Sequence, residues 1–184
     1  MKKILITLAV LVVLAALYGV SVYNGVVTQG QAVDSQLAKV ESSLQRRFDL
    51  IPNLVNSVKG TLKQEQAIFT ALAEARTKYA GATTLADKAA ASAQMESGLG
   101  RLIAIVENYP VLKSSEAVQT LMTQLEGTEN RINTERGRYN EMVQGYNVLV
   151  MRFPGSMFAK MYGFSAKEYF QADKAAAVVP AVNL

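Results

Sequence analysis

An uncharged apolar segment at the N-terminus limits what this chain can fold into. Met1-Lys2-Lys3 precedes twenty predominantly apolar residues, Ile4 to Tyr23, and no charged residue occurs from Ile4 through Val33. At a rise of about 1.5 Å per residue, twenty helical residues span about 30 Å, the thickness of the hydrocarbon layer of a bilayer. A helix that covers a globular core would show a polar face over this length, and this segment shows none. The segment therefore predicts a membrane-spanning helix.

Two other interpretations of this segment are a cleaved signal peptide and a buried core helix. A basic start followed by an apolar core is typical of a signal peptide. However, the small residues Ala15, Ala16, Gly19 and Ser21 form poor cleavage patterns, and the apolar run continues past Ala16. There is also no Cys for lipid attachment. We therefore expect an uncleaved anchor, whereas a mature chain that starts near Val22 would indicate cleavage.

The residues around the segment predict its orientation. Lys2 and Lys3 flank its short side, and the first charged residue on the long side is Asp34. By the positive-inside rule, the N-terminus lies in the cytoplasm and the rest of the chain lies outside. Tyr18 and Tyr23 would then lie toward the far interface, where aromatic residues are enriched. We expect a single-pass protein of the inner, cytoplasmic membrane with a periplasmic or extracellular domain.

The composition favours helices and excludes several kinds of chemistry. The chain has 184 residues, half of them hydrophobic, with 4 Pro and 12 Gly. It has no Cys and no His, which removes disulfides, thiol chemistry and the commonest general base and metal ligand. Without Lys2 and Lys3, 17 basic residues remain against 15 acidic ones. This near balance argues against a nucleic-acid partner.

Helical spacing of apolar residues continues after the anchor. We expect the first helix to be interrupted at Pro52, because proline removes a backbone donor and disfavours helical geometry before it. A second helix would carry Leu54 onward and end near Gly81. Thr84-Leu85-Ala86-Asp87 predicts the capping box of a third helix that stops at Asn108-Tyr109-Pro110.

The fourth predicted helix carries an aromatic residue at every seventh position: Tyr139, Tyr146 and Phe153. This spacing places the three rings along one stripe. The stripe could be a ligand-binding strip, but we interpret it as packing in which each Tyr hydroxyl reaches a polar partner. The Asn residues that follow the tyrosines would bond to neighbouring loops or helices. The helix would end at residues 153–155, and a second capping box at residues 165–168 predicts a short fifth helix.

These segments predict an all-α fold: an elongated antiparallel four-helix bundle with an N-terminal transmembrane helix and a short C-terminal helix. We expect three regions. Residues 1–23 form the cytoplasmic N-terminus and anchor, residues 24–172 form the helical bundle, and residues 173–184 form a loosely ordered tail.

Eight charged residues lie close to the apolar stripes, and they are the candidates for acid–base chemistry. A carboxylate pair would need a separation of about 5–10 Å in a cleft. The simpler interpretation is ion pairing between helices, and we expect Glu135 to contact an Arg or to lie at a hydrated flank of the core. The eight residues are Arg46, Arg47, Asp49, Glu65, Glu129, Arg131, Glu135 and Arg136.

Cofactor and metal motifs do not emerge from the sequence. A carboxylate metal site in a helical bundle typically uses Glu-x-x-His pairs, and this chain has no His. Gly98-Leu99-Gly100 lacks a third glycine and a preceding strand, so it does not predict dinucleotide binding. We expect no catalytic, cofactor-binding or metal-binding residues, and no cofactor.

Four motifs in order along the chain resemble those of the LemA family. They cover residues 46–55 (Arg-Arg-Phe-Asp-Leu-Ile-Pro-Asn-Leu-Val), residues 109–113 (Tyr-Pro-Val-Leu-Lys), residues 125–132 (Leu-Glu-Gly-Thr-Glu-Asn-Arg-Ile), and Tyr139-Asn140 through Phe153-Pro154. The resemblance extends over nearly the whole chain after the anchor. It implies a bacterial single-pass membrane protein with a helical-bundle domain and no established enzymatic activity.

The anchor and the missing catalytic constellation favour a scaffold or adaptor, not an enzyme, that acts by protein–protein contact in the cell envelope. We expect contact with the lipid bilayer through residues 4–23 and with a protein partner, such as a membrane protease or an envelope-stress component suggested at the family level. The oligomeric state stays open. The alternatives are a carboxylate-dependent envelope hydrolase, which needs a cleft with perturbed Asp or Glu residues, and a secreted bundle released by signal cleavage.

Overall fold

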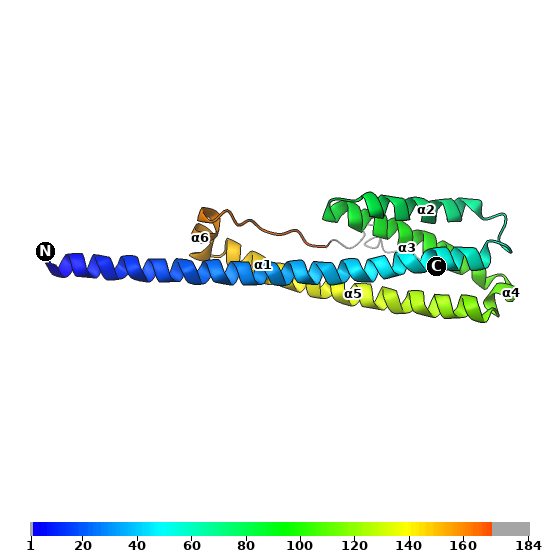
Figure 1. Ribbon diagram of the computed structural model, residues 1–184, viewed down its shortest axis with the longest axis horizontal. Helices are drawn as coiled ribbons and strands as arrows, with labels where there is room; N and C mark the ends of the chain where they lie inside the picture. Colours follow the sequence, from blue (N-terminus) through cyan, green and yellow to red (C-terminus); the bar gives the residue numbers. More distant parts are fainter. Residues whose placement is uncertain (1, 171–184) are drawn as a thin grey trace, which may run out of the picture. The chain divides into compact units, whose positions relative to one another are not determined.

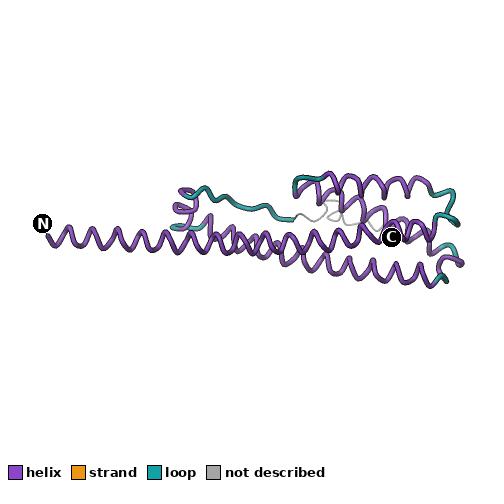
Figure 2. Tube along the Cα trace, in the orientation of Figure 1, coloured by secondary structure: helices purple, strands orange, loops and turns teal. Residues whose placement is uncertain are grey.

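The structure is a computed structural model that describes residues 2–170, and this part of the chain contains helices and loops but no strand (Figures 1 and 2). The all-α prediction is confirmed. The helices are α1 (Lys2–Val58), α2 (Gln66–Gly81), α3 (Leu85–Glu107), α4 (Pro110–Lys113), α5 (Glu116–Met151) and α6 (Gly155–Met161).

The first helix is longer than expected because Pro52 does not end it. α1 continues through Pro52 to Val58. Phe48, Ile51 and Leu54 around the proline are buried, so packing of this face offsets the hydrogen bond that proline removes. Leu54, which we expected to start a second helix, therefore belongs to α1. The break comes at residues 59–65 instead.

The described residues form two compact units. The anchor unit consists of residues 2–38 and 137–169, and the bundle unit consists of residues 39–136 and 170. Residues of α1 and α5 contribute to both units.

The bundle unit is built from four long helical segments, one each from α1, α2, α3 and α5, with the short α4 between α3 and α5 (Figure 1). Each segment buries one apolar face, which is the arrangement expected of a helical bundle. The predicted four-helix packing is found in this unit. Its buried apolar residues include Val40, Leu44, Phe48, Leu54, Leu72, Ala75, Met95, Leu99, Leu102, Val118, Leu125 and Ile132.

The connection between α2 and α3 has the predicted capping chemistry. The Thr84 hydroxyl oxygen accepts a hydrogen bond from the Asp87 backbone N–H at 3.1 Å, which satisfies one of the free donors at the start of α3. Farther along, α3 approaches α2 at Gly98. A Cβ there would lie 2.8 Å from Cδ2 of Leu72, so the absence of a side chain permits close packing of the two helices.

The aromatic stripe is only partly a packing stripe. In the anchor unit, Tyr139 and Tyr146 are buried, as predicted for a packing role. Phe153 is 73% exposed, so its predicted place in the stripe is wrong. The reason is that α5 ends at Met151, and the helical spacing no longer applies two residues later.

Residues 162–169 form no helix, so the short helix predicted at residues 165–168 is wrong. The short helix of this region is α6. Side chains of α5 hold the following segment instead: the Asn147 amide donates to Lys167 O at 2.9 Å and accepts from Lys167 N at 2.8 Å. The Tyr139 hydroxyl donates to Glu168 O at 3.0 Å. These bonds confirm the polar partners expected for the tyrosine and for an asparagine beside the stripe.

The N-terminal part of α1 is apolar and largely uncovered. α1 is long and apolar enough to cross a membrane. Only 6% of its most apolar stretch of 18 residues is buried. It therefore fits a membrane anchor. The boundary between anchor and bundle at residues 23 and 24 stays a prediction, and the tail predicted at residues 173–184 lies outside the described residues.

Candidate functional site

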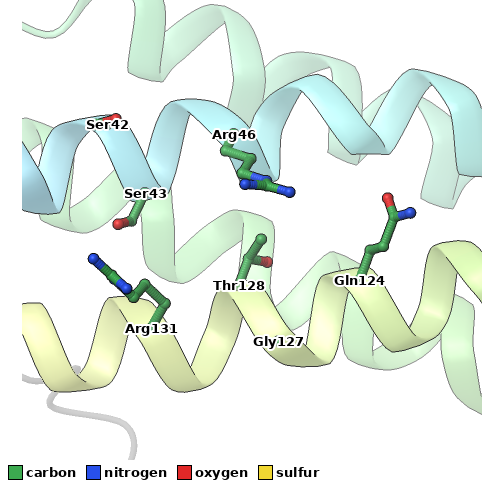
Figure 3. A pocket seen from close by; sticks show the side chains of 7 residues that line it. All are labelled: Ser42, Ser43, Arg46, Gln124, Gly127, Thr128 and Arg131. Carbon is green, nitrogen blue, oxygen red and sulfur yellow. The ribbon is translucent and has the colours of Figure 1, made fainter.

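An open groove runs between α1 and α5 in the bundle unit (Figure 3). It has a volume of about 530 Å³. Both helices supply polar side chains to it, so the groove differs from the apolar packing surface of the bundle. Its lining residues are Ser42, Ser43 and Arg46 from α1 and Gln124, Gly127, Thr128 and Arg131 from α5.

The electrostatics of this groove favour an anionic group. Arg46 and Arg131 bring two guanidinium groups to it, and no carboxylate occurs among the described residues that line it. Figure 3 shows the Arg131 side chain extending from α5 toward Ser43 on α1. Two hydroxyl donors are already used, because Ser43 donates to Lys39 O at 2.9 Å and Thr128 donates to Leu125 O at 2.7 Å. The guanidinium groups are therefore the main donors for a bound molecule.

Two local features keep the groove open and orient one arginine. A Cβ at Gly127 would meet no heavy atom within 4 Å, so a side chain there would occupy free space. Arg131 donates through Nε to Glu135 at 2.9 Å, and its side chain stays 68% exposed while that of Glu135 is 1% exposed. This pair confirms the predicted contact between Glu135 and an arginine. It also holds the Arg131 guanidinium in place while leaving donors free for a ligand.

A buried polar network lies in the same unit. Arg47 on α1 pairs with Glu129 on α5. Arg136 donates to the Ser92 hydroxyl on α3 at 2.7 Å, and its guanidinium lies 4.7 Å from the centre of the Phe170 ring. Burial lowers the pKa of Arg136, while nearby Glu96 and Glu129 oppose this shift. The network connects α1, α3 and α5, so the interpretation of these charges as structural ion pairs is confirmed for Arg47 and Glu129.

The remaining charged candidates, Asp49 and Glu65, are not among the residues that line the groove. Asp49 accepts from Gln45 at 2.9 Å and lies 3.9 Å from Arg76. Glu65 precedes α2, and its side chain makes no capping hydrogen bond. Within residues 2–170, no group of three or more acidic side chains could hold a metal ion.

Sequence reasoning identified Arg46 and Arg131 as charges near apolar stripes, but it missed the groove. The available signal was spacing: Ser42 and Arg46 lie four residues apart, as do Gly127 and Arg131. Such pairs share one helix face. Nothing in the sequence shows that these two faces are neighbours, which is a property of the packed helices.

The half-buried Tyr79 ring predicts a pH dependence of stability. The ring lies 4.3 Å from that of Phe48, and burial, followed by the charge of Glu41, raises the pKa of Tyr79 to about 12. The unfolded chain ionises this group near pH 10. The contribution of Tyr79 to stability is therefore complete below about pH 10 and is lost as the pH rises toward 12.

Between pH 8 and pH 11, we expect the free energy of unfolding to fall less for Tyr79→Phe than for the wild type. Denaturant unfolding followed by circular dichroism measures this free energy at each pH. Tyr109→Phe, at an exposed tyrosine just before α4, controls for loss of a hydroxyl group. Parallel pH profiles for the wild type and Tyr79→Phe would show that the shifted pKa of Tyr79 does not affect folding.

The fold and the groove together define a class: all-helical proteins with one N-terminal helix that fits a membrane anchor and a four-helix unit that exposes a polar groove. Comparison with known proteins identifies the family. The LemA family matches residues 36–184, and the chain belongs to this family. The resemblance that the sequence motifs indicated is thus confirmed.

Curated relatives include magnetosome proteins. The chain is 30% identical to magnetosome proteins MamQ 1 and MamQ 2 of Paramagnetospirillum magneticum. It is 28% identical to magnetosome protein MamQ of Magnetospirillum gryphiswaldense. Each match covers 88% of this chain and 68% of the relative.

Proposed function

We propose that this chain is a membrane-anchored scaffold or adaptor of the bacterial cell envelope, and that its groove between α1 and α5 receives an acidic segment of a partner protein. One observation carries the proposal: Arg46 and Arg131 both line an open groove, and the described residues of its lining include no carboxylate. The uncovered apolar helix supports the membrane attachment.

Carboxylates are the anions that best suit this groove. A guanidinium presents paired donors that match the two oxygens of a carboxylate, and the arginines come from two different helices. An exposed ion pair contributes only about 0–1 kcal/mol. A segment with several acidic residues would therefore bind better than one with a single acidic residue, and shape and length would add selectivity.

The proposed setting follows from the anchor. The N-terminus lies in the cytoplasm, the groove lies on the other side of the cytoplasmic membrane, and the partner is an envelope protein such as a membrane protease or a stress-response component. The names of the relatives place those proteins at magnetosomes and state no reaction. The family names therefore add no catalytic step, and binding is the activity that we propose.

Peptide binding to the full chain in detergent tests the proposal. The probe is a fluorescein-labelled peptide rich in Glu, and its comparison is the same peptide with Gln at every Glu position. We expect Gly127→Leu, which fills the groove, and Arg46→Glu, which reverses a charge, each to weaken binding of the Glu peptide about tenfold. This corresponds to about 1.4 kcal/mol of binding free energy. Fluorescence anisotropy measures the affinity.

Two matched variants serve as controls. Gly137→Leu makes the same change on α5 where a Cβ also meets no heavy atom within 4 Å. Lys39→Glu makes a similar charge reversal on α1 at an exposed position outside the groove lining. Equal binding of the Glu and Gln peptides, or equal losses in the control variants, would contradict a groove that selects acidic segments.

A further inference from the structure

Residues 151–162 form the corner between α5 and α6, and this corner exposes several large apolar side chains. Met151, Phe153, Met157 and Met161 are 62%, 73%, 63% and 66% exposed. Single exposed apolar residues are normal, but a cluster marks an interaction surface. The opposite side of α6 is buried at Gly155 and Ala159. This short helix therefore packs on one side and presents methionines on the other.

The corner packs against the distal end of the apolar segment of α1. The Phe158 ring lies 5.5 Å from the Tyr18 ring, and a Cβ at Gly19 would lie 3.1 Å from the same Phe158 ring. The Tyr162 ring lies 5.1 Å from that of Tyr23. These contacts place α6 beside residues 18–23 of α1.

This position corresponds to a defined depth in a bilayer. If residues 4–23 span the hydrocarbon, Tyr18 lies about 7.5 Å inside the boundary that Tyr23 marks, at about 1.5 Å per residue. Interfacial helices bury their apolar faces about 5–10 Å into the boundary between headgroups and acyl chains. The corner therefore lies at the depth of the boundary between headgroups and acyl chains, where an apolar surface next to basic side chains is stable.

The charges around the corner match a phospholipid surface. No acidic residue occurs between Glu141 and Glu168, and the corner itself carries the basic residues Arg152 and Lys160. The neighbouring Lys167 is already paired with Asp34. Arg152 and Lys160 are exposed, and long basic side chains extend from the interface to lipid phosphates while their stems stay in apolar surroundings.

We propose that the corner between α5 and α6 inserts into the interface of the same bilayer that α1 spans, as a second membrane contact that binds anionic phospholipid. The inference rests on the membrane attachment in the proposed function and is independent of the groove. It makes the anchor unit a two-point attachment, in which α1 crosses the membrane and the corner holds the end of α5 at its surface. The partner is lipid, argued from the depth of the corner and its basic charge, and a protein contact at the methionines is the competing outcome.

Single-cysteine labelling tests this contact, because the chain has no Cys of its own. The full chain is reconstituted in vesicles of phosphatidylethanolamine and phosphatidylglycerol and labelled with the polarity-sensitive fluorophore NBD at Met157→Cys. Val12→Cys reports the anchor, and Val111→Cys on α4 is an exposed apolar control in the bundle unit. We expect the Met157→Cys label to emit at shorter wavelength than the Val111→Cys label, and to lose emission when lipids brominated near the headgroup end of the acyl chain are included.

Each alternative outcome is distinguishable. If the Val12→Cys label is quenched by deeply brominated lipid but the Met157→Cys label is quenched only by iodide in the water, the anchor stands and the corner contact is refuted. If the Met157→Cys label is shielded from both quenchers, a protein surface covers it, and the lipid assignment is wrong. If the Val12→Cys label is not quenched by lipid, the membrane attachment in the proposed function fails, and the corner contact fails with it.

Discussion

Deletion of residues 4–23 is expected to move the protein from the membrane fraction to the soluble fraction. The deletion removes nearly all of the uncovered apolar surface of α1 and leaves the packed residues from Val26 onward. Without the spanning segment, the short α5–α6 corner is the remaining proposed contact, and a single interfacial contact gives only reversible attachment. Carbonate-washed membranes, followed by detection of the protein in pellet and supernatant, measure the change.

Two further measurements show whether loss of a spanning helix causes this change. A chain in which residues 4–23 are replaced by an unrelated twenty-residue Leu/Ala segment should stay in the membrane fraction, because length and apolarity are the relevant properties. Intact-mass measurement of the wild-type protein from membranes should include the N-terminal segment. A mature chain that starts near Val22 would support the cleaved-signal alternative and contradict the anchor.

Glu129→Gln is expected to destabilise the bundle by about 3 kcal/mol, because removal of one partner leaves the other charge buried and unpaired. The remaining charge is that of Arg47, whose side chain is 11% exposed. The Nε of Arg47 is already buried without a hydrogen-bond partner in the described part of the chain. Denaturant unfolding of the full chain in detergent, followed by circular dichroism, gives the free energy of unfolding.

A double variant without either charge separates the pair from its surroundings. Arg47→Met combined with Glu129→Met removes both charges, so its stability should lie close to that of the wild type and well above that of Glu129→Gln. If Glu129→Gln costs no more than an exposed change such as Glu126→Gln, the Arg47–Glu129 pair does not hold α1 and α5 together.

The parts of the fold that depend on local chemistry could be predicted from the sequence. The apolar segment of α1, the Thr84 cap of α3 and the burial of Tyr139 and Tyr146 follow from composition, spacing and backbone hydrogen bonding. The contact between Arg131 and Glu135 follows from four-residue spacing on one helix. Each of these features is determined within a few turns of helix.

The sequence predictions were wrong where packing between distant residues overrides the helix preference of a local segment. Pro52 disfavours a helix, but the buried face around it keeps α1 continuous. Residues 165–168 carry a capping-box pattern, yet Asn147 and Tyr139 bond the main chain of this segment in a non-helical form. These competing interactions come from residues far away in the sequence, so local patterns could not reveal them.

For the same reason, the sequence indicated two charged residues of the candidate site but not the groove itself. Arg46 and Arg131 stood out as charges, but the groove exists because α1 and α5 are neighbours and because Gly127 leaves space between them. The exposed corner at Phe153 was hidden by the seven-residue aromatic repeat, which suggested burial. The end of α5 at Met151 changed that assignment.

The most direct test of the central claim is site-specific photocrosslinking from the groove in intact cells. A photoreactive residue at Gln124 lies in the groove lining, whereas one at exposed Glu126, two residues away, lies outside it. We predict that Gln124 yields a discrete adduct whose crosslinked peptide is rich in Asp and Glu, that Glu126 does not yield it, and that Arg46→Glu strongly reduces its yield. The absence of an adduct from Gln124, or the same adduct from both positions, would contradict a membrane-anchored protein that binds its partner through this groove.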